Sequence, residues 1–139
     1  MARPRILLAE DHPGVAEQLR GLLESEFDVV ATVSDGKALL AVEDRIRPDV
    51  VVTDIMMPNL DGITATTALL ARRPGIRVVL VTVHDDADLA ERGYAAGALA
   101  CVLKVTAADE LVPAVRMAIR GQRHVSPRLR DPPAEPPPE

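Results

Sequence analysis

The chain has 139 residues, a formal net charge of −5 and a single cysteine. One domain of this length can bury a single core, and that core must be aliphatic because Phe27 and Tyr94 are the only aromatic residues. The acidic balance argues against non-specific binding to DNA or to an anionic membrane, two aromatics cannot form a stacking surface for single-stranded nucleic acid, and a lone Cys101 excludes an internal disulfide.

Apolar runs and amphipathic stretches then alternate along the chain. Strands are predicted over residues 5–9, 27–33, 49–53, 77–81 and 99–103. The third is an unbroken valine run, which is typical of a strand buried on both faces of a parallel sheet. A helix is predicted after each strand: from Pro13 with Asp11 or His12 as its cap, after Ser34–Gly36, after Pro58–Gly62, over 85–95 and over 107–120. The helix over 85–95 contains Gly93 and few large apolar residues, so it is weak and suits a moving part.

This (βα)₅ alternation favours an α/β fold with a five-stranded parallel sheet and helices on both of its faces. We expect the flavodoxin-like strand order 2-1-3-4-5. From Pro127 onward the chain is rich in proline and poor in apolar residues. We therefore expect one folded domain over residues 1–126 and a disordered tail over residues 127–139.

Four of the five predicted strands end in reactive polar residues, namely Glu10 with Asp11, Asp54, Thr82 and Lys104. Parallel strands point the same way, so these residues should share one edge of the sheet, where open α/β sheets bind ligands. Repulsion between carboxylates about 4 Å apart costs roughly 4 kcal/mol per pair at an effective dielectric near 20. A divalent cation would offset that cost, and oxygen-only ligands favour Mg²⁺.

Taken singly, each of these residues also has a structural explanation. Asp11 could cap a helix, Asp54 could be a turn carboxylate, and Thr82 could be an ordinary hydroxyl at a strand end. Lys104 is harder to explain in this way, because it is one of two lysines and directly follows an apolar run. Metal, lysine and hydroxyl together favour the transfer of a phosphoryl group to Asp54, a reaction that needs mainly positioning and charge neutralisation.

Residues 7–13, 53–62, 81–86 and 97–104 resemble the receiver domain of two-component response regulators. The resemblance covers about residues 3–126, nearly all of the predicted domain. The Asp-His-Pro opening at 11–13, the segment 82–86 and the segment 124–127 are similar to the NarL-type subgroup, whose receivers usually precede a helix-turn-helix output domain.

The resemblance implies that Asp54 becomes an aspartyl phosphate, taking the phosphoryl group from a histidine kinase and losing it by hydrolysis. Asp11 and Asp54 would bind Mg²⁺ with the Met56 backbone carbonyl as a third ligand, and Glu10 would act through water. Lys104 would pair with one phosphoryl oxygen. A further implication is that the Thr82 hydroxyl swings to bond another phosphoryl oxygen.

Two features depart from the family pattern. Receivers usually carry Tyr or Phe three residues before the lysine, as a rotamer switch coupled to the threonine, and here that residue is Cys101. We do not expect Tyr94 to substitute for it. No helix-turn-helix follows, so we expect no direct DNA binding unless an output domain lies outside this chain.

The remaining expectations concern location and partners. The first apolar run is too short for a signal peptide and nothing approaches transmembrane length, which favours a cytoplasmic protein without membrane contact. The implied partners are a histidine kinase and a second copy of the chain.

Two other functions stay open at this point. One is a Mg²⁺-dependent phosphohydrolase with Asp54 as nucleophile, which is disfavoured because Met56 stands where such enzymes carry an acid–base Asp. The other is an interaction module that no longer phosphorylates.

Overall fold

The computed structural model describes residues 3–126, so the predicted tail over 127–139 lies outside the described residues. Along the described chain the elements are β1 (Arg5–Ala9), α1 (Pro13–Glu24), β2 (Asp28–Val33), α2 (Gly36–Ile46), β3 (Val50–Asp54), α3 (Gly62–Arg72), β4 (Arg77–Thr82), α4 (Ala87–Ala96), β5 (Ala100–Leu103), a 3₁₀ turn η1 (Lys104–Thr106), α5 (Ala107–Ile119) and β6 (His124–Val125). Within residues 3–126, no helix combines the length and the apolar character needed to cross a bilayer.

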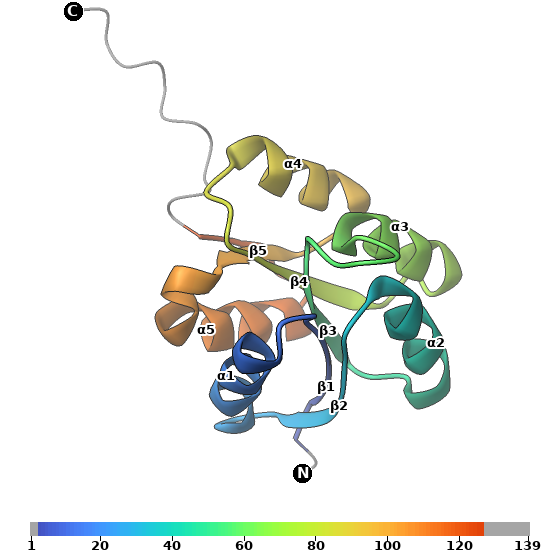
Figure 1. Cartoon of the computed structure of the whole chain (residues 1–139), viewed down its shortest axis with the longest axis horizontal. Helices are drawn as coiled ribbons and strands as arrows, with labels where there is room; N and C mark the ends of the chain where they lie inside the picture. The colour runs from blue at the N-terminus through green and yellow to red at the C-terminus, as the bar shows by residue number, and fades with distance from the viewer. Residues whose placement is uncertain (1–2, 127–139) are drawn as a thin grey trace, which may run out of the picture.

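The strands form one parallel sheet with the order β2-β1-β3-β4-β5-β6. The predicted order 2-1-3-4-5 is confirmed. The two-residue strand β6 was not predicted, and it extends the sheet beyond β5. Figure 1 shows α1 and α5 on one side of the sheet and α2, α3 and α4 on the other.

The core consists of two aliphatic layers, one on each face of the sheet. Val50 and Val52 of β3 pack into the layer covered by α1 and α5, while Val51 packs into the layer covered by α2, α3 and α4. Successive side chains of a strand point to opposite faces. The unbroken valine run is therefore explained by burial on both sides, and every residue of β3 is buried.

Polar side chains cap four of the helices at their N-termini. The His12 ring accepts a hydrogen bond from the Val15 amide at 3.3 Å and so caps α1. The sequence left Asp11 and His12 open for this role, and the structure selects His12. Asp35, Asp61 and Asp86 cap α2, α3 and α4, which satisfies backbone donors that would otherwise lack partners.

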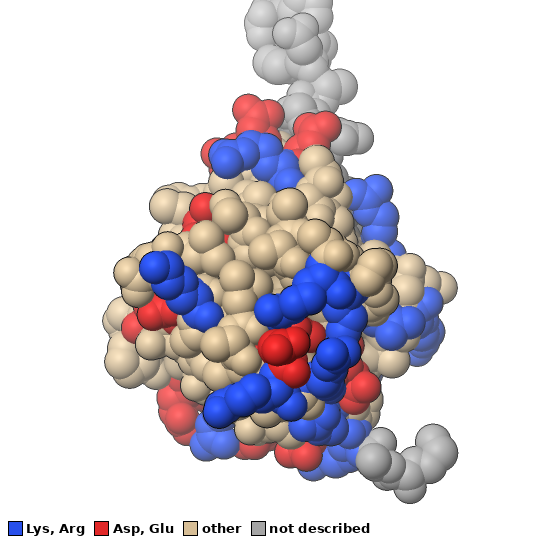
Figure 2. All heavy atoms as spheres, turned by 90° about the vertical axis from the view of Figure 1, so that its right-hand side faces the viewer, with Lys and Arg blue, Asp and Glu red and all other residues tan. Residues whose placement is uncertain are grey.

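One buried carboxylate joins α2 to the end of α3. Glu43 is 1% exposed and lies 2.8 Å from the Arg72 guanidinium and 3.1 Å from that of Arg73. Both arginines also donate to backbone carbonyls, of Leu40 and Pro48 respectively. Because both guanidinium groups pair with Glu43, the buried negative charge is compensated. On the face that carries α2 and α3, basic side chains gather in the lower part of the view (Figure 2).

Gly62 gives a test of how tightly α3 packs behind the carboxyl end of β3. A Cβ added there would lie 2.2 Å from the Asp54 carbonyl oxygen, whereas a Cβ at Gly21 would meet nothing within 4 Å. We expect Gly62→Ala to lower the free energy of unfolding by about 1–3 kcal/mol through overpacking. Gly21→Ala should be neutral or stabilising by up to about 1 kcal/mol, because alanine is the better helix former. Urea denaturation followed by circular dichroism measures both, and equal stabilities of the two variants would contradict the close packing.

Candidate functional site

The carboxyl edge of the sheet brings together the acidic residues that follow β1 and end β3. Glu10 and Asp54 are buried, at 2% and 5% exposure, and Asp11 is exposed. One carboxylate oxygen of each residue lies within 4.8 Å of the others. The two strands are neighbours in register, with Ala9 opposite Thr53. The sheet itself therefore sets the spacing of these carboxylates.

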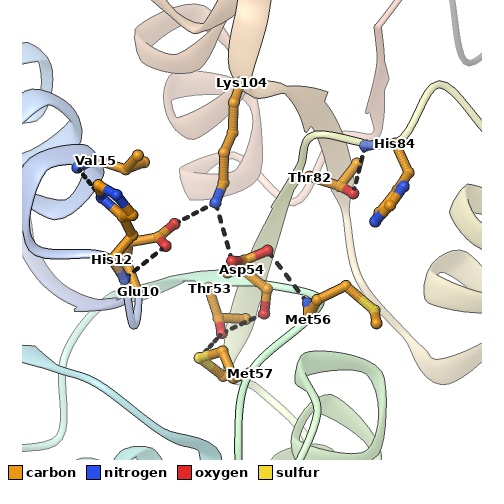
Figure 3. A network of polar contacts seen from close by, with 10 residues as sticks. All are labelled: Glu10, His12, Val15, Thr53, Asp54, Met56, Met57, Thr82, His84 and Lys104. Carbon is orange, nitrogen blue, oxygen red and sulfur yellow. Dashed lines mark hydrogen bonds and ion pairs between the residues drawn. The ribbon is translucent and has the colours of Figure 1, made fainter.

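Lys104 reaches into this acidic group from the residue that follows β5. Its Nζ lies 2.9 Å from Asp54 Oδ2 and also forms an ion pair with Glu10 (Figure 3). Burial alone would lower the pKa of Lys104, but the bonds to Glu10 and Asp54 outweigh it and raise the pKa above its ordinary value. Lys104 therefore stays charged. Burial raises the pKa of Glu10, while the Lys104 ammonium and the His12 amide act in the opposite direction.

Backbone amides fix the orientation of both buried carboxylates. The His12 amide donates to Glu10 Oε2 at 3.1 Å, and the Met56 amide donates to Asp54 Oδ1 at 3.2 Å. Residue types do not reveal such donors, so the sequence could not show them. One oxygen of Asp54 is thus held by Lys104 and the other by the chain that leaves β3.

Thr82 ends β4 and lies on the side of Asp54 away from Glu10 (Figure 3). Its hydroxyl accepts a hydrogen bond from the His84 amide at 3.0 Å. Figure 3 shows this hydroxyl turned toward the loop that follows β4, rather than toward Asp54. Met56, whose amide donates to Asp54, is 55% exposed. The structure thus brings Glu10, Asp54 and Lys104 into direct contact.

The donor set of this site fits a hard divalent cation. Three carboxylates approach one another, and a single ammonium offsets one of their negative charges. Mg²⁺ prefers oxygen ligands and retains several waters, and exposed Asp11 leaves one side of the group open to solvent. Neither a histidine nor the cysteine belongs to the cluster, which sets it apart from a zinc site.

Cys101, which stands in place of the expected aromatic residue, is fully buried on β5. Its backbone amide donates to the Tyr94 hydroxyl at 3.1 Å, and that hydroxyl donates to the His124 carbonyl at 2.9 Å. The sequence did not predict either contact, because it gave no reason to place α4 over the outer edge of β5.

A parallel sheet of this order, with a buried aspartate, an acidic pair and a lysine at its carboxyl edge, defines the receiver class of signalling domain. Residues 6–116 match the response regulator receiver domain family, and the chain belongs to that family. Its fold and its place among the proteins of two-component systems follow from that membership.

The relatives support this assignment. The chain is 32% identical over 127 residues to the transcriptional regulatory protein DegU of Brevibacillus brevis, covering 90% of this chain and 54% of that protein. It is 33% identical to the response regulator GacA of Pseudomonas aeruginosa, covering 90% and 59% respectively. A solved LuxR-family two-component response regulator from Aurantimonas sp. SI85-9A1 superimposes with a TM-score of 0.88 at 32% identity, covering 92% of this chain and 93% of that one. The chain thus spans little more than half the length of these two curated relatives.

The buried thiol gives a test of the core beside the site. Burial raises the pKa of Cys101 from 9.0 to about 12, and only the thiolate reacts with disulfide reagents. At pH 8 we expect the native protein to react with Ellman's reagent at least about a hundredfold more slowly than the guanidinium-unfolded chain. Because the thiol ionises more readily in the unfolded state, this group should destabilise the fold as the pH rises from about 9 towards about 12. Equal rates for the native and unfolded protein would contradict the burial.

Proposed function

We propose that this receiver is a phosphorylatable switch in which Asp54 accepts a phosphoryl group from a histidine kinase. The observation that carries the proposal is the contact of 2.9 Å between the Lys104 ammonium and the buried Asp54 carboxylate, beside two further carboxylates. A nucleophile paired with a fixed positive charge meets the two needs of phosphoryl transfer, namely positioning and charge neutralisation. A cytoplasmic location is proposed together with that partner.

Asp11 and Asp54 would hold Mg²⁺ at this site with the backbone carbonyl of Met56, and Glu10 would act through a water molecule. When bound, the cation supplies charge neutralisation for the incoming phosphoryl group. One carboxylate oxygen from each of Glu10, Asp11 and Asp54 lies within 4.8 Å of the others, which supports the carboxylate part of this ligand set. A neutral Met56 side chain beside Asp54 supplies no acid or base, which disfavours turnover of phosphate esters as the function.

In the transfer, an oxygen of the Asp54 carboxylate attacks the phosphorus of a phosphohistidine, and the P–N bond breaks with its electron pair leaving on the imidazole. Lys104 then moves its ammonium from the carboxylate to a phosphoryl oxygen. Thr82 turns its hydroxyl away from the His84 amide and donates to another phosphoryl oxygen. The new phosphate adds a charge of about −1.5 to −2, and this charge drives both movements.

A phosphorylation assay tests the acceptor directly. Incubation of the protein with acetyl phosphate and Mg²⁺ should add one phosphoryl unit to the intact mass. Asp54→Asn should abolish the gain because the nucleophilic carboxylate is lost. Asp44→Asn removes an exposed carboxylate on α2, and it should leave the gain unchanged. If the protein without substitutions gains no mass, an interaction module that is no longer phosphorylated is favoured.

Metal binding tests the role of the lysine. Because the Lys104 ammonium offsets the carboxylates that would hold the cation, Lys104→Met should raise the affinity for Mg²⁺ by about tenfold or more. It should also lower the stability of the metal-free protein, because Glu10 and Asp54 lose their buried counter-charge. Isothermal titration calorimetry measures the first effect and urea denaturation the second.

The only other lysine provides the control for this experiment. Lys37 is exposed on α2, so Lys37→Met should change neither quantity. Weaker Mg²⁺ binding by Lys104→Met would show that the ammonium does not compete with the cation.

A further inference from the structure

The Tyr94 hydroxyl lies at the junction of three elements. It projects from α4, accepts the Cys101 amide of β5 at 3.1 Å and donates to the His124 carbonyl of β6 at 2.9 Å. Those two backbone groups face each other in the parallel ladder, where Ala100 pairs with His124. Arg123 lies over the tyrosine ring, 4.6 Å from its centre. One hydroxyl therefore bridges β5 and β6.

A close approach of α4 to the sheet makes this reach feasible. A Cβ on Gly93 would lie 2.4 Å from Leu80 Cδ1 on β4, so a larger residue there would require the Leu80 side chain or the helix to shift. Tyr94, the next residue, is half-buried against the same apolar layer as Cys101. The small cysteine side chain leaves space on β5 for the ring. In Figure 1, α4 runs above β5, and the red end of the described chain lies alongside that strand.

Other described contacts also hold β6, among them the approach of Glu110 of α5 to the His124 ring at 3.4 Å. After α5 the chain reverses at Gly121, whose φ of +73° favours glycine. The His124 amide then donates to the Leu99 carbonyl at 2.9 Å and the Ser126 amide to the Cys101 carbonyl at 3.3 Å. Glu110 of α5 receives the Ser126 hydroxyl at 3.0 Å. A strand of two residues has few ladder bonds to break, so it can detach from the sheet at lower cost than the longer strands.

A series of hydrogen bonds connects Thr82 to the N-terminus of α4, the helix that carries Tyr94. The His84 amide donates to the Thr82 hydroxyl at 3.0 Å, and the Asp86 amide donates to the His84 carbonyl at 2.9 Å. Asp86 then caps α4 by accepting the amides of Asp88 and Leu89 at 2.9 and 3.2 Å. A turn of the Thr82 hydroxyl toward Asp54 removes the first bond of this chain. The loop and the helix that carries Tyr94 are then free to shift.

We propose that Tyr94 is a positioning residue that latches β6 onto β5 in the unphosphorylated protein, and that phosphorylation opens the latch by shifting α4. The inference rests on the proposed function for its trigger, but the latch itself is a property of the resting protein. It revises the expectation that Tyr94 does not substitute for the missing aromatic. In this proposal the aromatic residue that responds to phosphorylation lies on α4 instead of β5. It controls whether β6 stays paired with β5.

The latch is tested first without any phosphoryl mimic, by amide hydrogen exchange measured with NMR on the whole chain. Tyr94→Phe keeps the ring and removes only the hydroxyl. The amides of Cys101, His124 and Ser126 should then exchange about fivefold faster or more, the effect of losing one hydrogen bond of ordinary strength. Thr67→Val removes an exposed hydroxyl on α3 and should leave these amides unchanged. Unchanged exchange in Tyr94→Phe would overturn the proposal.

The trigger is tested by adding Mg²⁺ and beryllofluoride, a phosphoryl mimic. In the unchanged protein the same three amides should speed up towards their rates in Tyr94→Phe, and the variant should show little further change. If the mimic shifts the amide resonances of Thr82 and Lys104 but leaves these rates unchanged, the latch proposal fails while the proposed function stands. If it shifts neither resonance, the proposed function fails, and the comparison in the resting state still decides whether the latch exists.

Discussion

The ion pairs of Lys104 with Asp54 and Glu10 are the interaction on which the candidate site depends. They join the ends of three strands, β1, β3 and β5, that are far apart in the sequence. Two buried carboxylates this close would repel each other without the ammonium between them. The Lys104 ammonium therefore holds the two buried carboxylates together, and in the proposed function the same charge would pair with an incoming phosphoryl oxygen. Under the proposed function, the interaction that stabilises the unphosphorylated site is the one that phosphorylation would rearrange.

The fold constrains Asp54 from behind as well as from the side. Gly62 packs directly on the Asp54 carbonyl, and the Met56 amide holds one carboxylate oxygen. The chain must therefore leave β3 in a tight turn before α3 begins. Backbone contacts thus hold Asp54, whereas the Thr82 hydroxyl is bonded to the loop after β4. In the proposed switch Asp54 would stay fixed while that loop and α4 shift.

Much of the fold and of the site could be predicted, because both rest on side-chain patterns. The valine run of β3 and the polar residues at the strand ends fix the sheet and its functional edge. The missed features depend on the backbone or on distant packing. The choice of His12 over Asp11 as cap depends on the turn after β1. Strand β6 is two residues long and has no periodicity, and the reach of Tyr94 depends on the depth at which α4 packs.

The substitution of Cys101 for an aromatic residue acquires a structural meaning from the same packing. A large ring on β5 would occupy the layer between this strand and α4, where Tyr94 now lies. Because α4 carries the ring of Tyr94 instead, the tyrosine hydroxyl reaches the outer edge of β5, where β6 pairs. When β6 detaches, the edge of β5 exposes unpaired backbone groups, and such an edge readily accepts another strand. The receiver can thus change its surface at β5 while its core stays intact.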